Sequence, residues 1–376
     1  MPIQLSVAQK ELAWAMQLAT RVLPGRTPLQ SIAGVMLEAR GDTLSVRATD
    51  LEVSLELRIG ASIEQEGRTV LPGQHAAETV RSLPDGRLTL TEEEGRLVLA
   101  YGRGETALST YDAAQFPVFP EMEGGEAFFL TAEEWQAVLR QVTVACGHDE
   151  VQPLFTGVLW EAIPGKPLTL VATDTHRLAL WRKGEPRRET EEPVRAVIPR
   201  RALELAGRLA QAAGEGLAIE VGRRQVAVTG EAFTLVSRLI EGKYPAYEAV
   251  LPRELPTQVT VSVGPLLAAL ERAAILVREE DKPRANVVKL EIGPDKLTVS
   301  AQGAMGSLVE PLEAVTEGAT GEIYFNVRYL AEALRALSAE TARLRLNKDF
   351  SAALLSAQAD ETYLHLVLPV IVKSGA

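Results

Sequence analysis

The chain has 376 residues, a single cysteine and a formal net charge of −11. Its length accommodates two or three domains, and its net negative charge argues against a general nucleic-acid binder. Cys146 cannot form an intrachain disulfide or a cysteine-rich zinc site, so we expect it to be buried as a small apolar residue. The apolar stretches are too short for a membrane span, and the segment after Met1 is unlike a signal peptide. We therefore expect a cytoplasmic protein.

A short strand that ends in a helix-capping residue recurs along the chain at a spacing of 127 residues. Its three copies lie at 70–72, 197–199 and 324–326. A second pattern, a strand followed by a helical run, lies at 5–7, 130–132 and 261–263. Because solenoid repeats are only about 20–50 residues long, this period indicates a whole domain copied in tandem. We expect three domains, over residues 1–122, 126–252 and 256–376.

In the first copy, the predicted order is one strand, one helix and three strands, twice over. The helix over residues 8–22 has an apolar stripe spaced by three and four residues, formed by Leu12, Met16, Ala19 and Leu23. The helix over residues 73–83 begins behind Pro72 and turns Ala77, Val80 and Leu83 inward. Strands of alternating polarity are expected at 5–7, 35–39, 43–48, 53–57, 69–71, 87–91, 96–100 and 106–111.

The second and third copies repeat this order. Thr131 and Glu134 have the spacing of a capping box, in which each side chain binds the other residue's backbone amide. Asn326 is expected to cap the last helix. The four helices are predicted over 131–146, 199–212, 264–278 and 326–337. The whole chain is thus predicted to be an α+β protein of three tandem copies, each with two β-α-β-β-β units, with six helices and about eighteen strands.

Charge is distributed unevenly between the predicted helices and the remainder. The six helices together carry +4 and the rest of the chain carries −15. The basic residues that stand off the apolar stripes are Arg200, Arg201, Arg208, Arg272, Arg278, Arg328 and Arg335. This pattern fits a weakly basic helical surface that binds a polyanion loosely, but from charge alone ordinary solvated helix faces are the favoured interpretation.

One cluster suggests chemistry, Ala-Thr-Asp-Thr-His-Arg-Leu at 172–178. In an enzyme, Asp174 would orient His176 as a general base; in a turn, Asp174 would bind backbone amides and Arg177 would be solvated or paired. Ala-Thr-Asp also stands at 48–50, without the histidine and arginine, so we interpret it as a structural turn. We favour a binding surface over catalysis, and expect no enzymatic activity, cofactor or metal. The histidines lack zinc-binding spacing, and no phosphate-binding glycine loop occurs.

Four segments, at 171–179, 237–252, 325–330 and 366–371, resemble the bacterial DNA polymerase III beta subunits, the DNA sliding clamps. The resemblance covers the whole chain in order. It implies three clamp domains in a head-to-tail homodimeric ring, with helices around a central hole and sheets outside. Such a ring encircles double-stranded DNA without sequence preference. It tethers the DNA polymerase III catalytic subunit, the clamp loader and other proteins that carry a clamp-binding peptide, in which a glutamine precedes a leucine and an aromatic residue.

The resemblance also implies site residues. Leu178, Val250, Leu368 and Pro369 would wall a partner-peptide pocket between the second and third domains, with His176 and Arg177 at its rim. The full pocket set would be Phe155, Thr173, Thr175, His176, Arg177, Leu178, Pro245, Val250, Phe350, Leu366, Leu368, Pro369 and Val370. DNA contacts are implied for Arg26, Arg200 and Arg201, and a dimer seam for Leu108 against Ile275 and Leu276.

Two alternatives stay open from the residues alone. One is a small-molecule hydrolase or isomerase that uses Asp174 and His176, which requires a third catalytic group. The other is a tandem-domain scaffold that remains monomeric.

Overall fold

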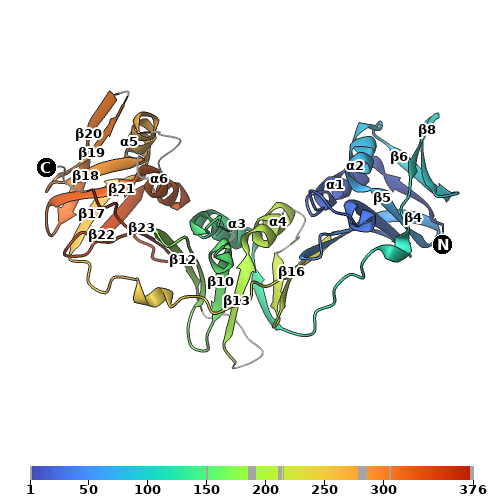
Figure 1. Cartoon of the computed structure of the whole chain (residues 1–376), viewed down its shortest axis with the longest axis horizontal. Coiled ribbons are helices and arrows are strands. Elements are labelled where there is room, and N and C mark those ends of the chain that lie inside the picture. The colour runs from blue at the N-terminus through green and yellow to red at the C-terminus, as the bar shows by residue number, and fades with distance from the viewer. Residues whose placement is uncertain are drawn as a thin grey trace. The chain divides into compact units, whose positions relative to one another are not determined.

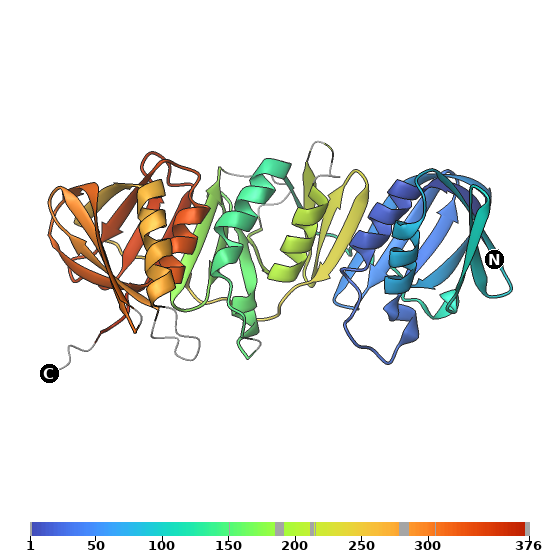
Figure 2. The same cartoon turned by 90° about the horizontal axis from the view of Figure 1, so that it is seen from above.

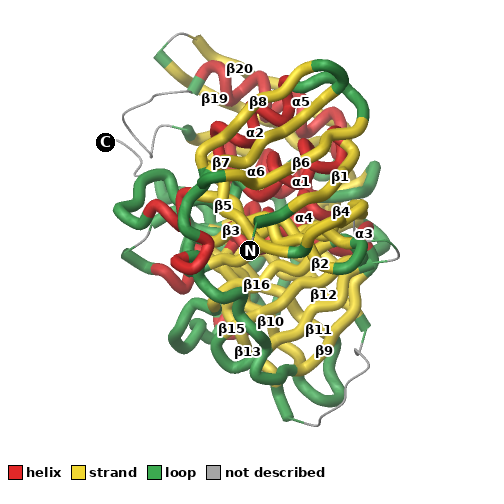
Figure 3. Tube along the Cα trace, turned by 90° about the vertical axis from the view of Figure 1, so that its right-hand side faces the viewer, coloured by secondary structure: helices red, strands yellow, loops and turns green. Residues whose placement is uncertain are grey.

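The computed structural model describes residues 2–149, 151–184, 192–210, 214, 216–277, 286–304 and 306–372. These residues form six α-helices and 24 β-strands (Figure 1), and Figure 3 shows the strands in yellow, with the helices in red. The predicted α+β class and the six helices are confirmed. The prediction of about eighteen strands was wrong, since two β-α-β-β-β units in each of three copies already require 24, and all are present, one strand before each helix and three after it.

Two compact units, rather than three, divide the chain. Apart from the gaps above, the first runs over residues 2–135 and 201–239, and the second over 136–200 and 240–372. The central copy is split between them because its strands β9 and β14–β16 join the first sheet, whereas β10–β13 join the second. Domain boundaries at 122/126 and 252/256 therefore stay a prediction drawn from the repeat.

The first unit is built on a twelve-stranded antiparallel sheet whose main path runs β8-β7-β6-β1-β4-β16-β15-β14-β9. Its strands are β1 (Gln4–Ala8), β2 (Gly34–Arg40), β3 (Thr43–Thr49), β4 (Val53–Gln65), β5 (Gly67–Pro72), β6 (Arg87–Glu93), β7 (Arg96–Tyr101), β8 (Gly104–Ser109), β9 (Glu126–Leu130), β14 (Leu217–Val221), β15 (Gln225–Gly230) and β16 (Phe233–Arg238). Strand β4 is much longer than the predicted 53–57, because its first residues pair with β16 and its last with β1.

The second unit has its own twelve-stranded antiparallel sheet, in the order β13-β10-β11-β12-β24-β23-β22-β17-β20-β19-β18-β21. Its strands are β10 (Gly157–Ala162), β11 (Leu168–Thr173), β12 (Arg177–Lys183), β13 (Val194–Pro199), β17 (Thr257–Ser262), β18 (Val287–Ile292), β19 (Lys296–Gly303), β20 (Gly306–Glu317), β21 (Gly321–Asn326), β22 (Thr341–Leu346), β23 (Ala353–Ala357) and β24 (Tyr363–Val367). Here β12 of the central copy pairs with β24 of the third copy, which makes the two copies share one sheet.

Helices pack in pairs against the sheets. Helices α1 (Gln9–Ala19) and α2 (Gly73–Ser82) lie side by side in the first unit, and α5 (Val263–Leu276) and α6 (Val327–Ala336) in the second (Figure 2). The predicted apolar stripes face inward. Their buried members include Leu12, Met16, Ala77, Val80, Leu266, Leu270, Leu330 and Leu334. No helix in the described part of the chain is long and apolar enough to cross a membrane.

Helices α3 (Ala132–Gln141) and α4 (Arg200–Leu209) belong to the central copy. The predicted capping box is confirmed: the Thr131 amide donates to Glu134 Oε2 at 2.9 Å, and the Glu134 amide to Thr131 Oγ1 at 3.2 Å. The Asn326 cap of α6 is confirmed too, since its Oδ1 accepts from the Arg328 amide at 3.0 Å.

Helix α3 ends before the predicted residue 146. The β-branched run that starts at Val142 is unfavourable in a helix, and residues Thr143–Ala145 form a 3₁₀ turn instead. Cys146 follows this turn and is buried, as predicted. The ends of two other predicted helices, at residues 211–212 and Arg278, lie outside the described residues.

A buried polar pair lies on one face of β24. Tyr363 Oη and His365 Nδ1 are 2.6 Å apart, and the His365 side chain is 0% exposed. Its other ring nitrogen, Nε2, has no hydrogen-bond partner among the described residues. Burial, aided by the positive charge of Arg177, lowers the pKa of His365 to about 3. His365 is therefore neutral in the folded protein at neutral pH.

This depressed pKa predicts a loss of stability in mild acid. Below pH ~6.5 the unfolded chain binds a proton at His365 that the folded chain does not, so the unfolding free energy falls by roughly 1 kcal/mol per pH unit. Above that pH the contribution is fully present. Urea unfolding midpoints at about pH 7.5 and pH 5.5 measure the slope. A His365→Gln variant with the same slope as the original protein would contradict the assignment.

Candidate functional site

The turn between β11 and β12 is held by its own side chains. Thr173 Oγ1 donates to the Arg177 carbonyl at 2.6 Å and accepts from the Thr175 amide at 3.1 Å. Asp174 Oδ1 accepts from the amides of His176 at 3.1 Å and Arg177 at 3.0 Å. These bonds support Thr175 at a φ of 73°, where a β-branched residue is rarely found. The prediction of a structural turn with Asp174 on backbone amides is confirmed.

Arg177 does not stand at a rim, and that prediction was wrong. The residue is 3% exposed, because β12 points its side chain to the helix-bearing face of the sheet. Its Nε donates to Asp174 Oδ2 at 3.0 Å, and its Nη1 pairs with Glu332 of α6. A buried guanidinium requires such carboxylate partners, and Glu332, remote in the chain, gave no sign of this role in the sequence.

Tyr329 of α6 completes the cluster around the turn. Its ring stacks on the His176 ring with centroids 6.2 Å apart, and the Arg177 guanidinium lies 4.4 Å from its centroid. Burial and the charge of Asp174 raise its pKa. Tyr329 was not predicted as a site residue, although it lies inside the 325–330 segment that carries the resemblance.

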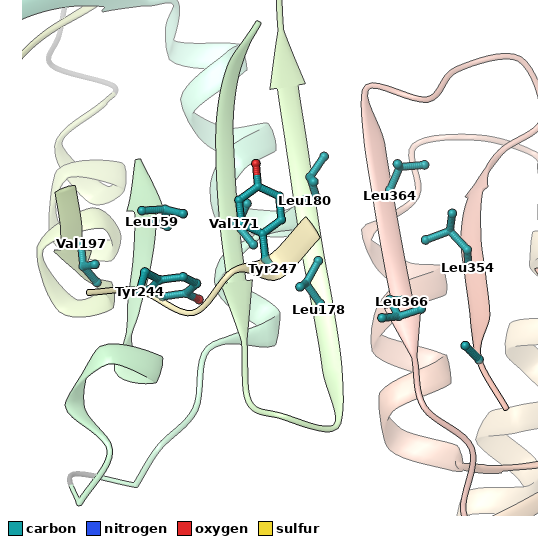
Figure 4. Packing of buried hydrophobic residues seen from close by; sticks show 11 residues of the cluster. Leu159, Val171, Leu178, Leu180, Val197, Tyr244, Tyr247, Leu354, Leu364 and Leu366 are labelled. Carbon is teal, nitrogen blue, oxygen red and sulfur yellow. The ribbon is translucent and has the colours of Figure 1, made fainter. Parts of the chain in front are cut away.

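The opposite face of the same strands is apolar. Leu178 and Leu180 of β12 are the register partners of Leu366 and Leu364 on the neighbouring strand β24, on the same side of the sheet (Figure 4). They belong to one buried cluster, formed by Leu159, Val171, Leu178, Leu180, Val197, Tyr244, Tyr247, Ala352, Leu354, Leu364 and Leu366. Leu178, predicted to form a wall of the pocket, is thus a buried member of this cluster.

The segment that follows β16 packs against this cluster through two buried tyrosines, Tyr244 and Tyr247. The Tyr247 hydroxyl donates to Glu161 Oε2 at 2.8 Å, and the Tyr244 ring meets the Phe155 ring edge-on at 6.3 Å. Burial raises the pKa of both tyrosines. Pro245, between them, is exposed. The tyrosines bring the predicted site residues Phe155 and Pro245 to the apolar cluster.

Exposed apolar side chains lie next to the cluster. Val250 is 56% exposed and its amide donates to the Tyr247 carbonyl at 3.2 Å. Leu368 is 39% exposed and its amide donates to the His176 carbonyl at 2.9 Å. We call Val250 and Leu368, together with the buried cluster residues Leu178 and Leu366, the apolar surface.

The remaining predicted pocket residues lie on segments that lead into this region. Pro369 and Val370 follow Leu368 and are half-buried, and the Val370 amide donates to the Tyr324 carbonyl at 2.8 Å. Phe350, two residues before the cluster member Ala352, lies so close to Gly321 that a Cβ there would come within 2.2 Å of its ring.

Strand pairing joins neighbouring copies at two places: β4 with β16 joins the first and central copies, and β12 with β24 joins the central and third. We call these the first and second joints. The first joint is equivalent to the second but has a different surface. Thr49 and Asp50 make the same turn, with Leu51 at a φ of 76°, and β4 pairs with β16 as β12 pairs with β24. The positions equivalent to Leu178 and Leu180 are Ser54 and Glu56. Their face carries an ionic network in place of an apolar one, in which Arg47 pairs with Glu38 and Glu56, and Arg58 pairs with Glu56.

The residues expected to contact DNA have differing surroundings. Arg26 is exposed. Arg200 Nη1 lies 3.4 Å from His148 Nε2. Arg201 pairs with Asp50 and donates to the Val22 carbonyl at 3.1 Å, so it clamps the first turn. Their contact with DNA stays a prediction.

The predicted dimer residues are accessible to differing degrees. Leu108 lies on β8, which ends the main path of the first sheet, and is half-buried. Ile275, near the end of α5, is 76% exposed, whereas Leu276 is half-buried. Leu276 packs closely over the β19–β20 hairpin, where a Cβ at Gly303 would come within 1.8 Å of the Leu276 carbonyl oxygen.

Two further observations concern ligands. A crevice of about 370 Å³ lies at the ends of α3 and α6. It shares no residue with the apolar surface, since it is lined by Gln141, Leu337, Ser338, Ala339, Glu340, Thr341, Ala357, Gln358, Ala359, Asp360 and Tyr363. Among the described residues, no group of three or more histidines, cysteines and carboxylates is arranged to hold a metal ion.

Comparisons with known proteins agree along the whole chain. Residues 3–120, 130–246 and 248–371 match the N-terminal, central and C-terminal domains of the DNA polymerase III beta subunit. The beta sliding clamp of Synechococcus elongatus is 32% identical over 99% of this chain and 100% of its own length. The DNA polymerase sliding clamp structure from Bacillus subtilis superimposes with a TM-score of 0.93 at 26% identity, over 99% of this chain and 100% of that one.

A further structure, the Pseudomonas aeruginosa sliding clamp bound to griselimycin, has a TM-score of 0.91 at 27% identity, over 99% of this chain and 100% of that one. The repeated α+β domain is thus that of a DNA clamp. The chain belongs to the family of DNA polymerase III beta subunits, the beta sliding clamps, which take part in DNA replication.

Proposed function

We propose that two copies of this chain form a head-to-tail ring that encircles double-stranded DNA and tethers the replicative polymerase. The proposal extends to three domains over residues 1–122, 126–252 and 256–376, and to a cytoplasmic site of action. The observation that carries it is a full-length match to sliding clamps in a chain whose two homologous joints differ, one ionic and one apolar. Retention on DNA is then topological, since the closed ring surrounds the duplex. Contacts with phosphates carry no sequence information, so the ring would have no sequence preference.

The apolar surface is the proposed binding site for partner peptides. Exposed Val250 and Leu368, on segments that adjoin a preformed leucine-rich cluster, fit the apolar side chains of a short linear peptide. The polar turn at 173–176 offers hydrogen-bonding groups beside them. The partners we infer are the DNA polymerase III catalytic subunit, the clamp loader and other proteins that carry the glutamine–leucine–aromatic pattern.

The alternative of a hydrolase or isomerase receives no support from the local geometry. The Asp174 carboxylate binds the backbone amide of His176 and the guanidinium of Arg177, whereas the His176 ring stacks on Tyr329. A general base oriented by a carboxylate needs that carboxylate at its ring nitrogen. We therefore infer a binding role for this turn, without turnover.

Peptide binding is tested by truncating the two exposed anchors. We expect Leu368→Ala and Val250→Ala each to weaken binding of a labelled clamp-binding peptide about tenfold or more, because central apolar anchors contribute roughly 2 kcal/mol each. Fluorescence anisotropy measures the affinity. Val315→Ala is the matched control, since Val315 is 63% exposed in the same unit but outside the site. Unchanged affinity in both anchor variants would refute the assignment.

Dimerisation is tested by placing a charge at the proposed seam. Ile275→Asp should give a 40.7 kDa monomer, because burying an unpaired carboxylate costs several kcal/mol in roughly any interface. Ile275 is largely exposed in the single chain, so the change should leave its fold intact. Light scattering after size exclusion measures the mass, with Val118→Asp as the exposed control. A dimer that persists at low concentration would mean that the seam lies elsewhere, and a monomeric original protein would favour the scaffold alternative.

DNA retention is tested on nicked circles. Free protein should bind linear duplex weakly, since only a modest basic bias on the helices opposes a net charge of −11. Protein assembled on a closed circle by a clamp loader should resist high salt and be released when the circle is cut. Tight, sequence-specific binding to linear duplex would contradict the proposal.

A further inference from the structure

Glu332 connects α6 to the turn that borders the apolar surface. One of its oxygens pairs with buried Arg177 and the other lies 3.5 Å from Nε of Arg328, one helical turn earlier. Arg177 in turn pairs with Asp174 and lies on the Tyr329 ring. A carboxylate on one copy thereby holds the turn of another.

We propose that Glu332 is a positioning residue for the peptide site, acting through Arg177 and Tyr329 without touching the peptide. The inference rests on the proposed function of the apolar surface. It adds a residue that lies on the opposite face of the shared sheet, from which the peptide itself is excluded.

The positioning role depends on the buried guanidinium of Arg177. Arg177 is buried, so its charge must be matched by carboxylates. Asp174 already accepts two backbone amides, and Glu332 supplies the second carboxylate. Replacing Glu332 by a neutral residue leaves Arg177 with Asp174 alone, and the guanidinium is then free to leave the Tyr329 ring.

Displacement of Arg177 would disturb the apolar surface through two sets of contacts, one of its backbone and one of its side chain. Its backbone is part of the turn, whose His176 carbonyl accepts from the amide of the exposed anchor Leu368. Its side chain shares the Tyr329 ring with the His176 ring. Both sets of contacts end at groups that would border a bound peptide.

The first joint provides an internal comparison. There the helix reaches the turn directly, because Arg201 of α4 pairs with Asp50. The turn has Val53 where the second has Arg177, and α4 has Ala202 where α6 has Tyr329. A helix-to-turn clamp therefore occurs in both joints, but the relay through a buried arginine and a tyrosine occurs only in the joint that carries the apolar surface.

The test compares Glu332→Gln, Glu332→Asp and Glu271→Gln in the full-length protein. Glu271 pairs with Arg335 at 2.8 Å on the exposed surface of α5 and α6, so Glu271→Gln removes the same charge without touching the relay. Anisotropy with a labelled glutamine–leucine–aromatic peptide gives affinity, and the NMR signal of the His176 ring reports its stacking on Tyr329.

We expect Glu332→Gln to weaken peptide binding about fivefold, a usual size for coupling within one network, and to shift the His176 signal toward that of an unstacked ring. Glu332→Asp should restore part of both, and Glu271→Gln should change neither. Dimer mass should be the same in all variants.

The outcomes separate this inference from the proposed function. If the original protein fails to bind the peptide, the apolar surface is not the site and the proposed function falls with it. If the original protein binds but Glu332→Gln binds equally well with an unshifted His176 signal, the positioning role is overturned and the site stands. Equal loss in Glu271→Gln would also overturn the inference, since it would reduce the effect to net charge.

Discussion

Antiparallel pairing of strands from neighbouring copies is the interaction on which the rest of this structure depends. A lone copy would leave the edges of β4, β12, β16 and β24 with unpaired backbone groups. Pairing β4 with β16 and β12 with β24 removes those edges and fixes register across each joint. It also explains why the two compact units divide the chain within the central copy: β9 and β14–β16 extend the sheet of the first copy, and β10–β13 extend the sheet of the third.

Register at the second joint sorts side chains onto two faces with opposite character. Because residues alternate along a strand, Leu178 and Leu366 point to one side, and Arg177 and His365 to the other. The first side becomes the apolar surface. The second side must bury a cation and an imidazole, and it does so with Asp174 and Glu332 for the cation and with a neutral ring for the histidine. A one-residue slip would exchange the two faces.

Local patterns in the sequence predict much of this fold, and fail where partners are remote. The helical stripes, the Thr131 capping box and the Asn326 cap depend on neighbours within a few residues, and all three are confirmed. The length of β4 depends on two partners far away in the chain, so its predicted end at residue 57 was too early. The burial of Arg177 depends on Glu332, 155 residues further on, and no local pattern signals that pairing.

The two homologous joints have diverged, so that in the described part of the chain the second carries the apolar surface and the first does not. The turn, the strand pairing and the clamp from a helix are common to both joints, so they serve the joint itself. What differs is the face of the sheet opposite the helices, which has Ser54 and Glu56 in the first joint and Leu178 and Leu180 in the second. The ion pairs of the first joint are partly buried, and they keep that face from offering apolar area to a partner. The repeat thus supplies the same strand pairing and turn twice, and a few side-chain identities decide which of the two carries the apolar surface.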